Sequence, residues 1–368
     1  MINPFNPSFG RPPEIFLGRN DIIRDILSSI DEENSPWRTT LLVGIRGSGK
    51  TALLNSIHSR LASQNVVIVS VSPEDDFLND ILSQIYNQLP KSKLKIIPKV
   101  KELKINVGVS IGFENSPEEM PFTNIFRNHL TRMLDILRKE NIHTLFLIDE
   151  SQKHTSAMRT FIASYQKLIG QGYSISMVLA GLPSVVSAVL NDDVLTFLRR
   201  AKRVELENVD IALVNYDYRV AFQKSSFNIE PEIIGKAANF SCGYPYLFQL
   251  VGYYLWENAK DYYGDNLFEK AVIHAKTELF KNVHSLVFTD LSYKDREFIF
   301  AMLDDGNHTR FSDIVERLKK EKNYVSRYRE RLISSGAVKS VGHGLLDFTY
   351  PYMREFLRTK RDKNAYYY

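Results

Sequence analysis

Cysteine is nearly absent from this chain, because Cys242 is the only one in 368 residues. A single cysteine forms no internal disulfide, so we expect a protein that folds in a reducing compartment, the cytoplasm. Long apolar runs are also missing, since no stretch approaches the roughly 18 apolar residues of a membrane helix. The N-terminus lacks the basic and apolar segments of a signal peptide. The eight histidines show no metal-ligand spacing and Cys242 has no Cys or His partner nearby, so we expect no zinc site.

Excess charge is small and unevenly placed. The formal net charge is +4, while residues 294–363 alone hold sixteen Lys and Arg against eleven Asp and Glu. The rest of the chain is therefore close to neutral. This asymmetry indicates either an anionic partner for the C-terminal end or an ordinary solvated basic surface.

The first half of the chain alternates apolar strands with helical segments. Strands are predicted at Thr39–Val43, Val66–Val71, Thr144–Ile148, Ile175–Ala180 and Val204–Leu206. Such alternation is typical of a parallel sheet with crossover helices. Residues 1–19, which are rich in Pro, Gly and Phe, precede it as an extended arm, followed by a helix near Asp21–Ile30.

One insert, near residues 91–119, departs from this pattern. Its apolar residues alternate strictly with polar and small residues from Leu103 to Phe113, which predicts a long β-strand, with residues 93–99 as a hairpin partner. An exposed strand of this kind is either an edge for a partner or oligomer, or a hairpin packed on its own sheet.

Strand signals disappear after about residue 210. Helices are predicted at Ile211–Ser225, Pro231–Asn239, Pro245–Tyr262 and Leu267–Lys281. Three short helices follow, at Asp295–Leu303, Ser312–Leu318 and Asn323–Ser334, and then a hairpin of Val338–Val341 and Leu345–Phe348 around a Gly-His-Gly turn. Three helices and a hairpin describe a winged helix. We therefore expect an arm and core over 1–209, a helical lid over 210–287 and a winged helix over 288–368.

A phosphate-binding motif follows the first strand. Residues 44–51, Gly-Ile-Arg-Gly-Ser-Gly-Lys-Thr, satisfy G-x-x-x-x-G-K-[ST] between an apolar strand and a helix. Its glycines let backbone N–H groups approach phosphates, and the helix N-terminus favours anions. We assign nucleotide binding to six residues of the loop and its end: Gly44, Arg46, Gly47, Ser48, Gly49 and Lys50. Lys50 is expected at the β- and γ-phosphates, and Thr51 at Mg²⁺.

A second motif completes the site. The apolar strand ending at Ile148 delivers Asp149 and Glu150 to the edge where the P-loop lies. Asp149 is predicted to hold Mg²⁺ through water, and Glu150 to act as the general base that polarises the attacking water. The two motifs together predict ATP and Mg²⁺ as cofactors and a magnesium-dependent ATPase.

These motifs resemble those of the AAA+ ATPases with a C-terminal winged helix, over nearly the whole chain. The arrangement is similar to that of bacterial ATP-binding proteins built like archaeal origin-recognition initiators. The segments that carry this similarity are Asn6–Gly10, Leu17–Arg19, Ile148–Gln152, Ala180–Pro183, Gly243–Tyr246 and Tyr328–Ile333. The resemblance implies an αβα P-loop NTPase core, an α/β fold, followed by a helical lid and a winged helix.

The resemblance also implies roles for three residues outside the two motifs. Arg19, in Phe-Leu-Gly-Arg, matches a signature beside the adenine, and Pro245, in Gly-Tyr-Pro, resembles the lid proline of signalling STAND ATPases. Pro245 is also expected at a helix start, and both roles are compatible. Arg200, or secondarily Arg203, lies where AAA+ proteins place an arginine that enters a neighbour's site, which points to a homo-oligomer; the alternative is a solvated or ion-paired cluster. Without an evident sensor arginine, the resemblance favours a slow switch.

The winged-helix segment carries the candidate DNA contacts. Its second and third helical segments are crowded by six cations: Lys319, Lys320, Lys322, Arg327, Arg329 and Arg331. Of these we select Lys320, Arg327 and Arg331, together with His343 in the turn of the hairpin. Helix spacing places Arg327 and Arg331 on one face, with Arg329 rotated away by roughly 200°. The sequence thus predicts an ATP-controlled switch that acts on DNA or a DNA-bound assembly in replication, transposition or defence. The alternative is a STAND-like signalling ATPase whose winged helix is a protein–protein module.

Overall fold

A computed structural model describes residues 2–8, 14–15, 17–74, 76–90, 92, 122–149, 155–193, 195–224, 227, 229–261 and 266–364. The chain divides into two compact units. The core unit comprises residues 19–44 and 50–206, and the lid unit comprises residues 1–18, 45–49 and 207–368. The predicted insert at 91–119 lies outside the described residues, apart from Ser92. In the described part, no helix is long and apolar enough to cross a membrane.

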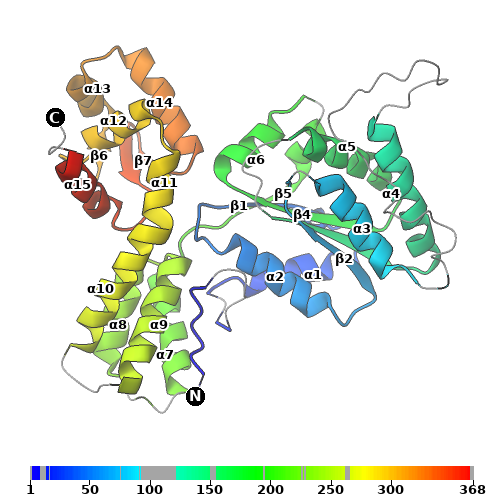
Figure 1. Ribbon diagram of the computed structural model, residues 1–368, viewed down its shortest axis with the longest axis horizontal. Helices are drawn as coiled ribbons and strands as arrows, with labels where there is room; N and C mark the ends of the chain where they lie inside the picture. The colour runs from blue at the N-terminus through cyan, green and yellow to red at the C-terminus, as the bar shows by residue number, and fades with distance from the viewer. Residues whose placement is uncertain are drawn as a thin grey trace. The chain divides into compact units, whose positions relative to one another are not determined.

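The core unit is built on a parallel sheet of five strands in the order β2-β3-β4-β1-β5 (Figure 1). The strands are β1 (Thr39–Val43), β2 (Val66–Val71), β3 (His143–Ile148), β4 (Ile175–Gly181) and β5 (Lys202–Glu205). All residues of β3 and β4 are buried, which explains their unbroken apolar sequences, because helices cover both faces of such sheets. The predicted strands are confirmed, although β5 begins two residues earlier than expected.

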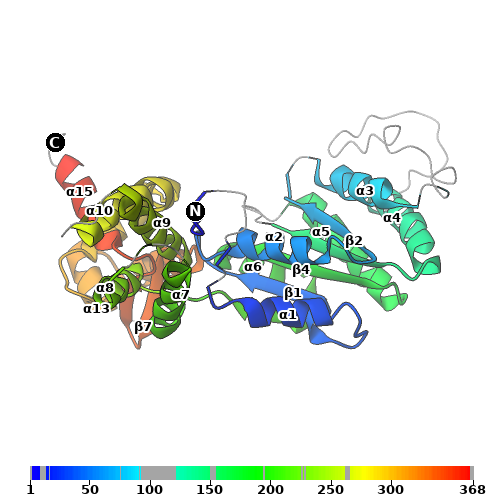
Figure 2. The ribbon, with the colours of Figure 1, turned by 90° about the horizontal axis from the view of Figure 1, so that it is seen from below.

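Helices form a layer on each face of this sheet (Figures 1 and 2). On one face, α1 and α2 pack together. On the other, α3 to α6 form a continuous core with alternate strand residues such as Phe146 and Ile148. The helices are α1 (Asn20–Ser28), α2 (Lys50–Leu61), α3 (Phe77–Gln88), α4 (Phe122–Lys139), α5 (Ser156–Gly170) and α6 (Pro183–Leu190). The predicted αβα core is confirmed.

The lid unit begins with four helices where the sequence predicted them. They are α7 (Ile211–Gln223), α8 (Pro231–Ser241), α9 (Pro245–Asp261) and α10 (Leu267–Leu279), and a π-helical segment (Phe280–His284) leads into α11 (Ser285–Asp290). The N-terminal arm packs on these helices. Phe5 is 2% exposed and lies against Gly252, Tyr218, Phe222, Phe248 and Trp256. The arm therefore belongs with the lid, whereas we expected it with the core.

The C-terminal module, residues 292–364, contains the three short helices and the hairpin of the sequence pattern. Its elements are α12 (Tyr293–Ala301), β6 (Thr309–Arg310), α13 (Phe311–Leu318), α14 (Lys322–Ser334), β7 (Val338–Gly342), β8 (Leu345–Phe348) and α15 (Met353–Asn364). β8 pairs antiparallel with both β6 and β7. One hydrophobic core runs through this module and the lid helices, and the expected boundary at residues 287 and 288 falls inside α11.

Candidate nucleotide site

The P-loop connects β1 to α2. Gly44 continues β1 by donating its N–H to the carbonyl of Gly181, at 3.2 Å. Lys50 begins α2 and is 5% exposed, with its Nζ donating to the Gly44 carbonyl at 3.0 Å. The ammonium group of Lys50 therefore lies beside the carbonyl of Gly44, the first residue of the motif. Thr51 follows in the first turn of α2, half-buried.

The tip of the loop is a tight turn. The N–H of Ser48 donates to the Ile45 carbonyl at 3.3 Å, and Gly47 and Gly49 adopt positive φ angles of 73° and 93°. Successive N–H groups in such a conformation form a concave nest that binds anions. The Ser48 hydroxyl is buried and has no hydrogen-bond partner among the described residues, which is costly unless a ligand satisfies it. These features fit phosphate groups.

Asp149, a predicted magnesium ligand in the core unit, lies at the carboxyl end of the parallel sheet. Asp149 directly follows β3 and donates its N–H to the Val71 carbonyl at 2.9 Å, so the end of β2 fixes its backbone. Because only β4 lies between β1 and β3, the ends of these two strands are about 10 Å apart. Thr51 and Asp149 have the hydroxyl and carboxylate oxygens that Mg²⁺ prefers. Glu150 lies outside the described residues.

Arg19 and Pro245 are placed at helix starts. Arg19 is half-buried and directly precedes α1, in the core unit. Pro245 is the first residue of α9, in the lid unit. Gly243, two residues before Pro245, has a φ of 68°, and a Cβ on it would lie 2.0 Å from the Val209 carbonyl oxygen. The Gly-Tyr-Pro motif therefore marks a close backbone approach and a helix start, and its role at the adenine stays a prediction.

Residues 36–189 match a family model described as an AAA domain. The Walker-type ATPase PABY2304 of Pyrococcus abyssi has a similar structure, with a TM-score of 0.63 and 16% identity over 94% of this chain and 96% of that chain. The ADP form of the Aeropyrum pernix ORC2 protein gives a TM-score of 0.52 and 14% identity, over 96% and 97%. The fold is that of an AAA+ P-loop ATPase. Residues 281–357 match a domain of unknown function, DUF8462, and no curated protein sequence matches the chain.

In the core unit, Arg200 lies at the edge of the sheet opposite the end of β1 where the P-loop begins. It ends the 3-10 helix Thr196–Arg200 and lines a groove of about 510 Å³ with Thr39 and Ile175, the first residues of β1 and β4. Gly44 follows the other end of β1, about 16 Å away for a strand of five residues. Arg200 is therefore remote from the phosphate loop of its own chain. Arg203, on β5, shares a groove of about 430 Å³ with Val43, at the P-loop edge of the sheet.

The cations of the C-terminal module fall into two groups. The first is held by intramolecular carboxylates. Arg331 donates from Nε and Nη2 to Asp295 Oδ1, at 2.8 and 2.5 Å, and also to the Ser292 hydroxyl. Asp295 is 4% exposed and closes a capping box at the start of α12 with Ser292. The helix spacing predicts that Arg331 faces DNA, whereas in the structure its guanidinium is bound to Asp295 and Ser292 at the start of α12.

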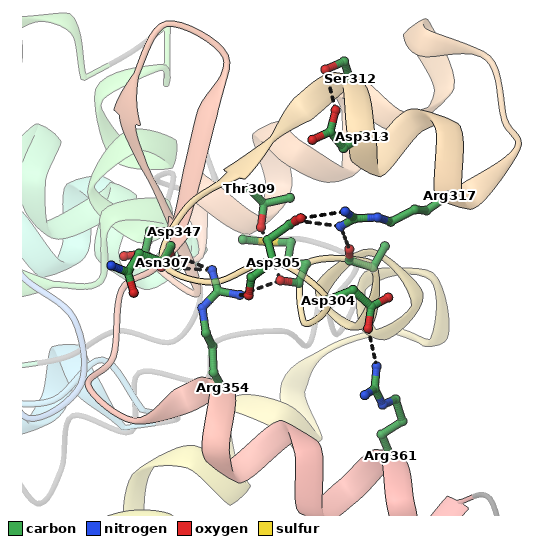
Figure 3. Close-up of polar contacts among 12 residues, drawn as sticks. Asp304, Asp305, Asn307, Thr309, Ser312, Asp313, Arg317, Asp347, Arg354 and Arg361 are labelled. Carbon is green, nitrogen blue, oxygen red and sulfur yellow. Dashed lines mark hydrogen bonds and ion pairs between the residues drawn. The ribbon is translucent and has the colours of Figure 1, made fainter.

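Three further arginines of the first group surround the loop between α12 and β6 (Figure 3). Arg317 forms two hydrogen bonds of 2.6 Å with the Asp305 carboxylate, which holds the pKa of that carboxyl below its usual value. Arg354 donates to the backbone carbonyls of Met302, Asp305 and Asn307, and Arg361 pairs with Asp304. These contacts fasten α13 and α15 to the loop and engage three arginines of the module within the protein, although the net charge of the module stays the same.

The second group is exposed and forms no ion pair within the described residues. It includes Lys320 and Arg327, which the sequence analysis names as candidate DNA contacts, and also Arg310 and Lys322. Arg310 and Lys322 line a groove of about 640 Å³ together with His343, Ser312 and Gly344. The sequence analysis counts Lys322 among the cations of this segment but not Arg310, and it does not place either of them beside His343. Their proximity depends on the pairing of Arg310 with Leu345, which no local sequence pattern encodes.

Proposed function

We propose that this chain is a magnesium-dependent ATPase of slow turnover that acts as a molecular switch. The observation that carries this proposal is the P-loop, with its anion nest at residues 47–49, the buried Lys50, and a Ser48 hydroxyl that has no partner in the described part of the chain. Lys50 would bind the β- and γ-phosphates, and Thr51 and Asp149 would hold Mg²⁺. The metal ion neutralises charge on the phosphate oxygens when it is bound. Glu150, next to Asp149 in the chain, would accept a proton from the attacking water.

Calorimetry with ATP and Mg²⁺, together with an assay of ATP turnover, tests this proposal on the wild type, Lys50→Ala and Glu150→Gln. The Lys50→Ala protein should lose ATP binding, because the cation at the phosphates is gone. The Glu150→Gln protein should bind ATP and turn it over far more slowly, since glutamine keeps the shape of glutamate without its basicity. Unchanged ATP affinity in Lys50→Ala would refute the site, and unchanged turnover in Glu150→Gln would refute the role of the base.

We further propose that the C-terminal module is a winged helix that binds DNA. Four exposed cations that form no ion pair with any described residue support this role: Arg310, Lys320, Lys322 and Arg327, with His343 in the β7–β8 turn. Arg310 ends β6, Lys320 lies between α13 and α14, and Lys322 and Arg327 lie on α14, which would give contacts with several phosphates. In this proposal Arg331 holds α14 on α12 and does not contact DNA.

A second candidate is a signalling switch whose C-terminal module is a protein–protein module. The continuous core between this module and the lid helices favours it, as do the four arginines that bind carboxylates or carbonyls within the module. Fluorescence anisotropy with duplex DNA separates the two candidates. Binding weaker than about 10⁻⁴ M at physiological salt, the weak end of non-specific affinity, would favour the signalling switch.

The position of Arg200 supports an oligomer as the active form. In its own chain this arginine lies a strand length away from the P-loop, so only a second copy could present it to bound phosphates. An arginine at that position contributes about 10³- to 10⁵-fold to phosphoryl-transfer rates. Turnover per chain that rises with protein concentration, and does not rise in Arg200→Ala, would support this assignment. A turnover rate that does not depend on protein concentration and is equal in the wild type and Arg200→Ala would refute this role of Arg200.

A further inference from the structure

The tip of the P-loop is held by lid residues far away in the sequence. Residues 45–49 belong to the same compact unit as the lid helices. The Tyr244 hydroxyl donates to the Arg46 carbonyl at 2.5 Å. The N–H of Tyr246 donates to the Gly47 carbonyl at 3.2 Å. Two consecutive carbonyls of the loop are thus bound by the start of α9.

The conformation of the turn shows why the first of these contacts matters. Ile45 to Ser48 form a turn closed by one backbone hydrogen bond, with positive φ at Gly47 and not at Arg46, which is a type II turn. Types I and II differ by a rotation of the central peptide, here the one between Arg46 and Gly47. In a trans peptide the N–H points opposite to the carbonyl. A donor that fixes the Arg46 carbonyl therefore also fixes the direction of the Gly47 N–H.

We propose that Tyr244 is a positioning residue for the phosphate site: its hydroxyl selects the peptide orientation in which the Gly47 N–H points away from the lid and toward bound phosphate. This inference rests on the proposed nucleotide binding. Tyr244 touches no reacting atom, and it acts only through the loop backbone.

The surroundings of Tyr244 support this role. Its side chain is fully buried and packs edge-on against Tyr350, with ring centroids 6.3 Å apart, so the ring has little freedom to move. Burial raises the pKa of Tyr244 well above its ordinary value, so the hydroxyl keeps the proton that it donates. A Cβ on Gly47 would lie 2.0 Å from the Tyr244 oxygen. The Tyr244 hydroxyl therefore leaves no room for any residue other than glycine at position 47.

A second contact extends the same connection toward the C-terminal module. The Arg46 guanidinium donates to Asp290 at 3.0 Å. Asp290 ends α11, two residues before Ser292 caps α12. Because Asp290 is largely exposed, this ion pair is weak by itself. This ion pair nevertheless connects Arg46, whose carbonyl accepts the hydrogen bond from Tyr244, with the segment that leads into α12.

The test compares two conservative variants in the full-length chain. Tyr244→Phe removes only the hydroxyl above Arg46. The control, Tyr218→Phe, removes an equally buried lid hydroxyl that donates to the Phe248 carbonyl at 2.8 Å, away from the loop. We expect ADP affinity, measured by calorimetry, to fall about fivefold in Tyr244→Phe, the equivalent of one hydrogen bond of about 1 kcal/mol. Tyr218→Phe should bind ADP like the wild type.

Hydrogen exchange provides a readout that does not depend on the ligand. Amides of residues 46–48 should exchange faster in nucleotide-free Tyr244→Phe than in the wild type or in Tyr218→Phe. Equal ADP affinity and equal exchange in all three proteins would overturn the role of Tyr244, while loss of binding in Lys50→Ala would still uphold the nucleotide site. Equal weakening by both tyrosine variants would reduce Tyr244 to ordinary lid packing. A wild type that binds no ADP would overturn both the proposed function and this inference.

Discussion

Arg327 and Arg331 lie on the same helix, α14, and offer a direct test of which cations are free for a partner. Arg327 is exposed and forms no ion pair within the described residues. Arg331 binds the buried Asp295 at 2.5 Å. We predict that Arg327→Ala weakens DNA binding without changing stability. We predict the opposite for Arg331→Ala.

The magnitudes follow from these contacts. If Arg327 meets one phosphate, its loss should reduce the slope of log affinity against log salt by about 0.9. Loss of Arg331 leaves the carboxylate of Asp295, a residue that is 4% exposed, with the hydroxyl and the N–H of Ser292 as its only donors among the described residues. Removing one partner of a fully buried pair costs about 3–5 kcal/mol. Because the Arg331 side chain is 52% exposed, solvent screening reduces our expectation to about 1–2 kcal/mol.

Two measurements decide the outcome. Thermal unfolding should show a midpoint lower by about 2–8 °C for Arg331→Ala, at 2–4 °C per kcal/mol in a unit of this size, and no shift for Arg327→Ala. Salt titrations of DNA binding by fluorescence anisotropy should show the reverse. A reduced salt slope in Arg331→Ala with unchanged stability would refute our reading of the Asp295 contact. An unchanged slope in Arg327→Ala would remove that residue from the DNA interface.

Three further predictions concern the lid unit. Phe5→Ala should lower the free energy of unfolding by about 3–5 kcal/mol in denaturant titrations, because it empties a buried aromatic site; a change below 1 kcal/mol would contradict the docked arm. Gly47→Ala should abolish ADP binding in calorimetry because of the Tyr244 oxygen, whereas Gly306→Ala, where a Cβ meets no atom within 4 Å, should bind normally; ADP binding by Gly47→Ala would contradict the packed loop. Burial lowers the pKa of His284 to about 4. Between pH 6.5 and 4 this histidine is therefore protonated in the unfolded state and neutral in the folded state. The free energy of unfolding should fall as the pH falls through this range, by about 3 kcal/mol in total. His284→Phe should remove that part of the acid sensitivity in unfolding titrations from pH 7 to 4, and an identical pH profile would refute it.

Elements with strong local signals could be predicted from the sequence. The strands β1 to β4 were predicted because parallel strands buried on both faces need unbroken apolar runs. The helices α7 to α10 were predicted because their starts carry local signals, such as Pro231 and Pro245 at first helical positions. The P-loop could be identified because glycine conformations and a lysine at fixed spacing are local requirements of phosphate binding. The sequence by itself therefore determined the αβα core and the candidate phosphate site.

Contacts between distant segments were decided only by the tertiary structure. Arg331 and Arg327 are equivalent in helix spacing, yet only Arg331 meets Asp295, which is 36 residues away. Tyr244 meets Arg46 across 198 residues, and the arm places Phe5 in the lid core. A side chain's spacing along a helix sets its face, but the packing of other elements decides what lies opposite that face. The sequence thus determined which residues could bind phosphates, and the tertiary structure decided which of them are already bound to the protein itself.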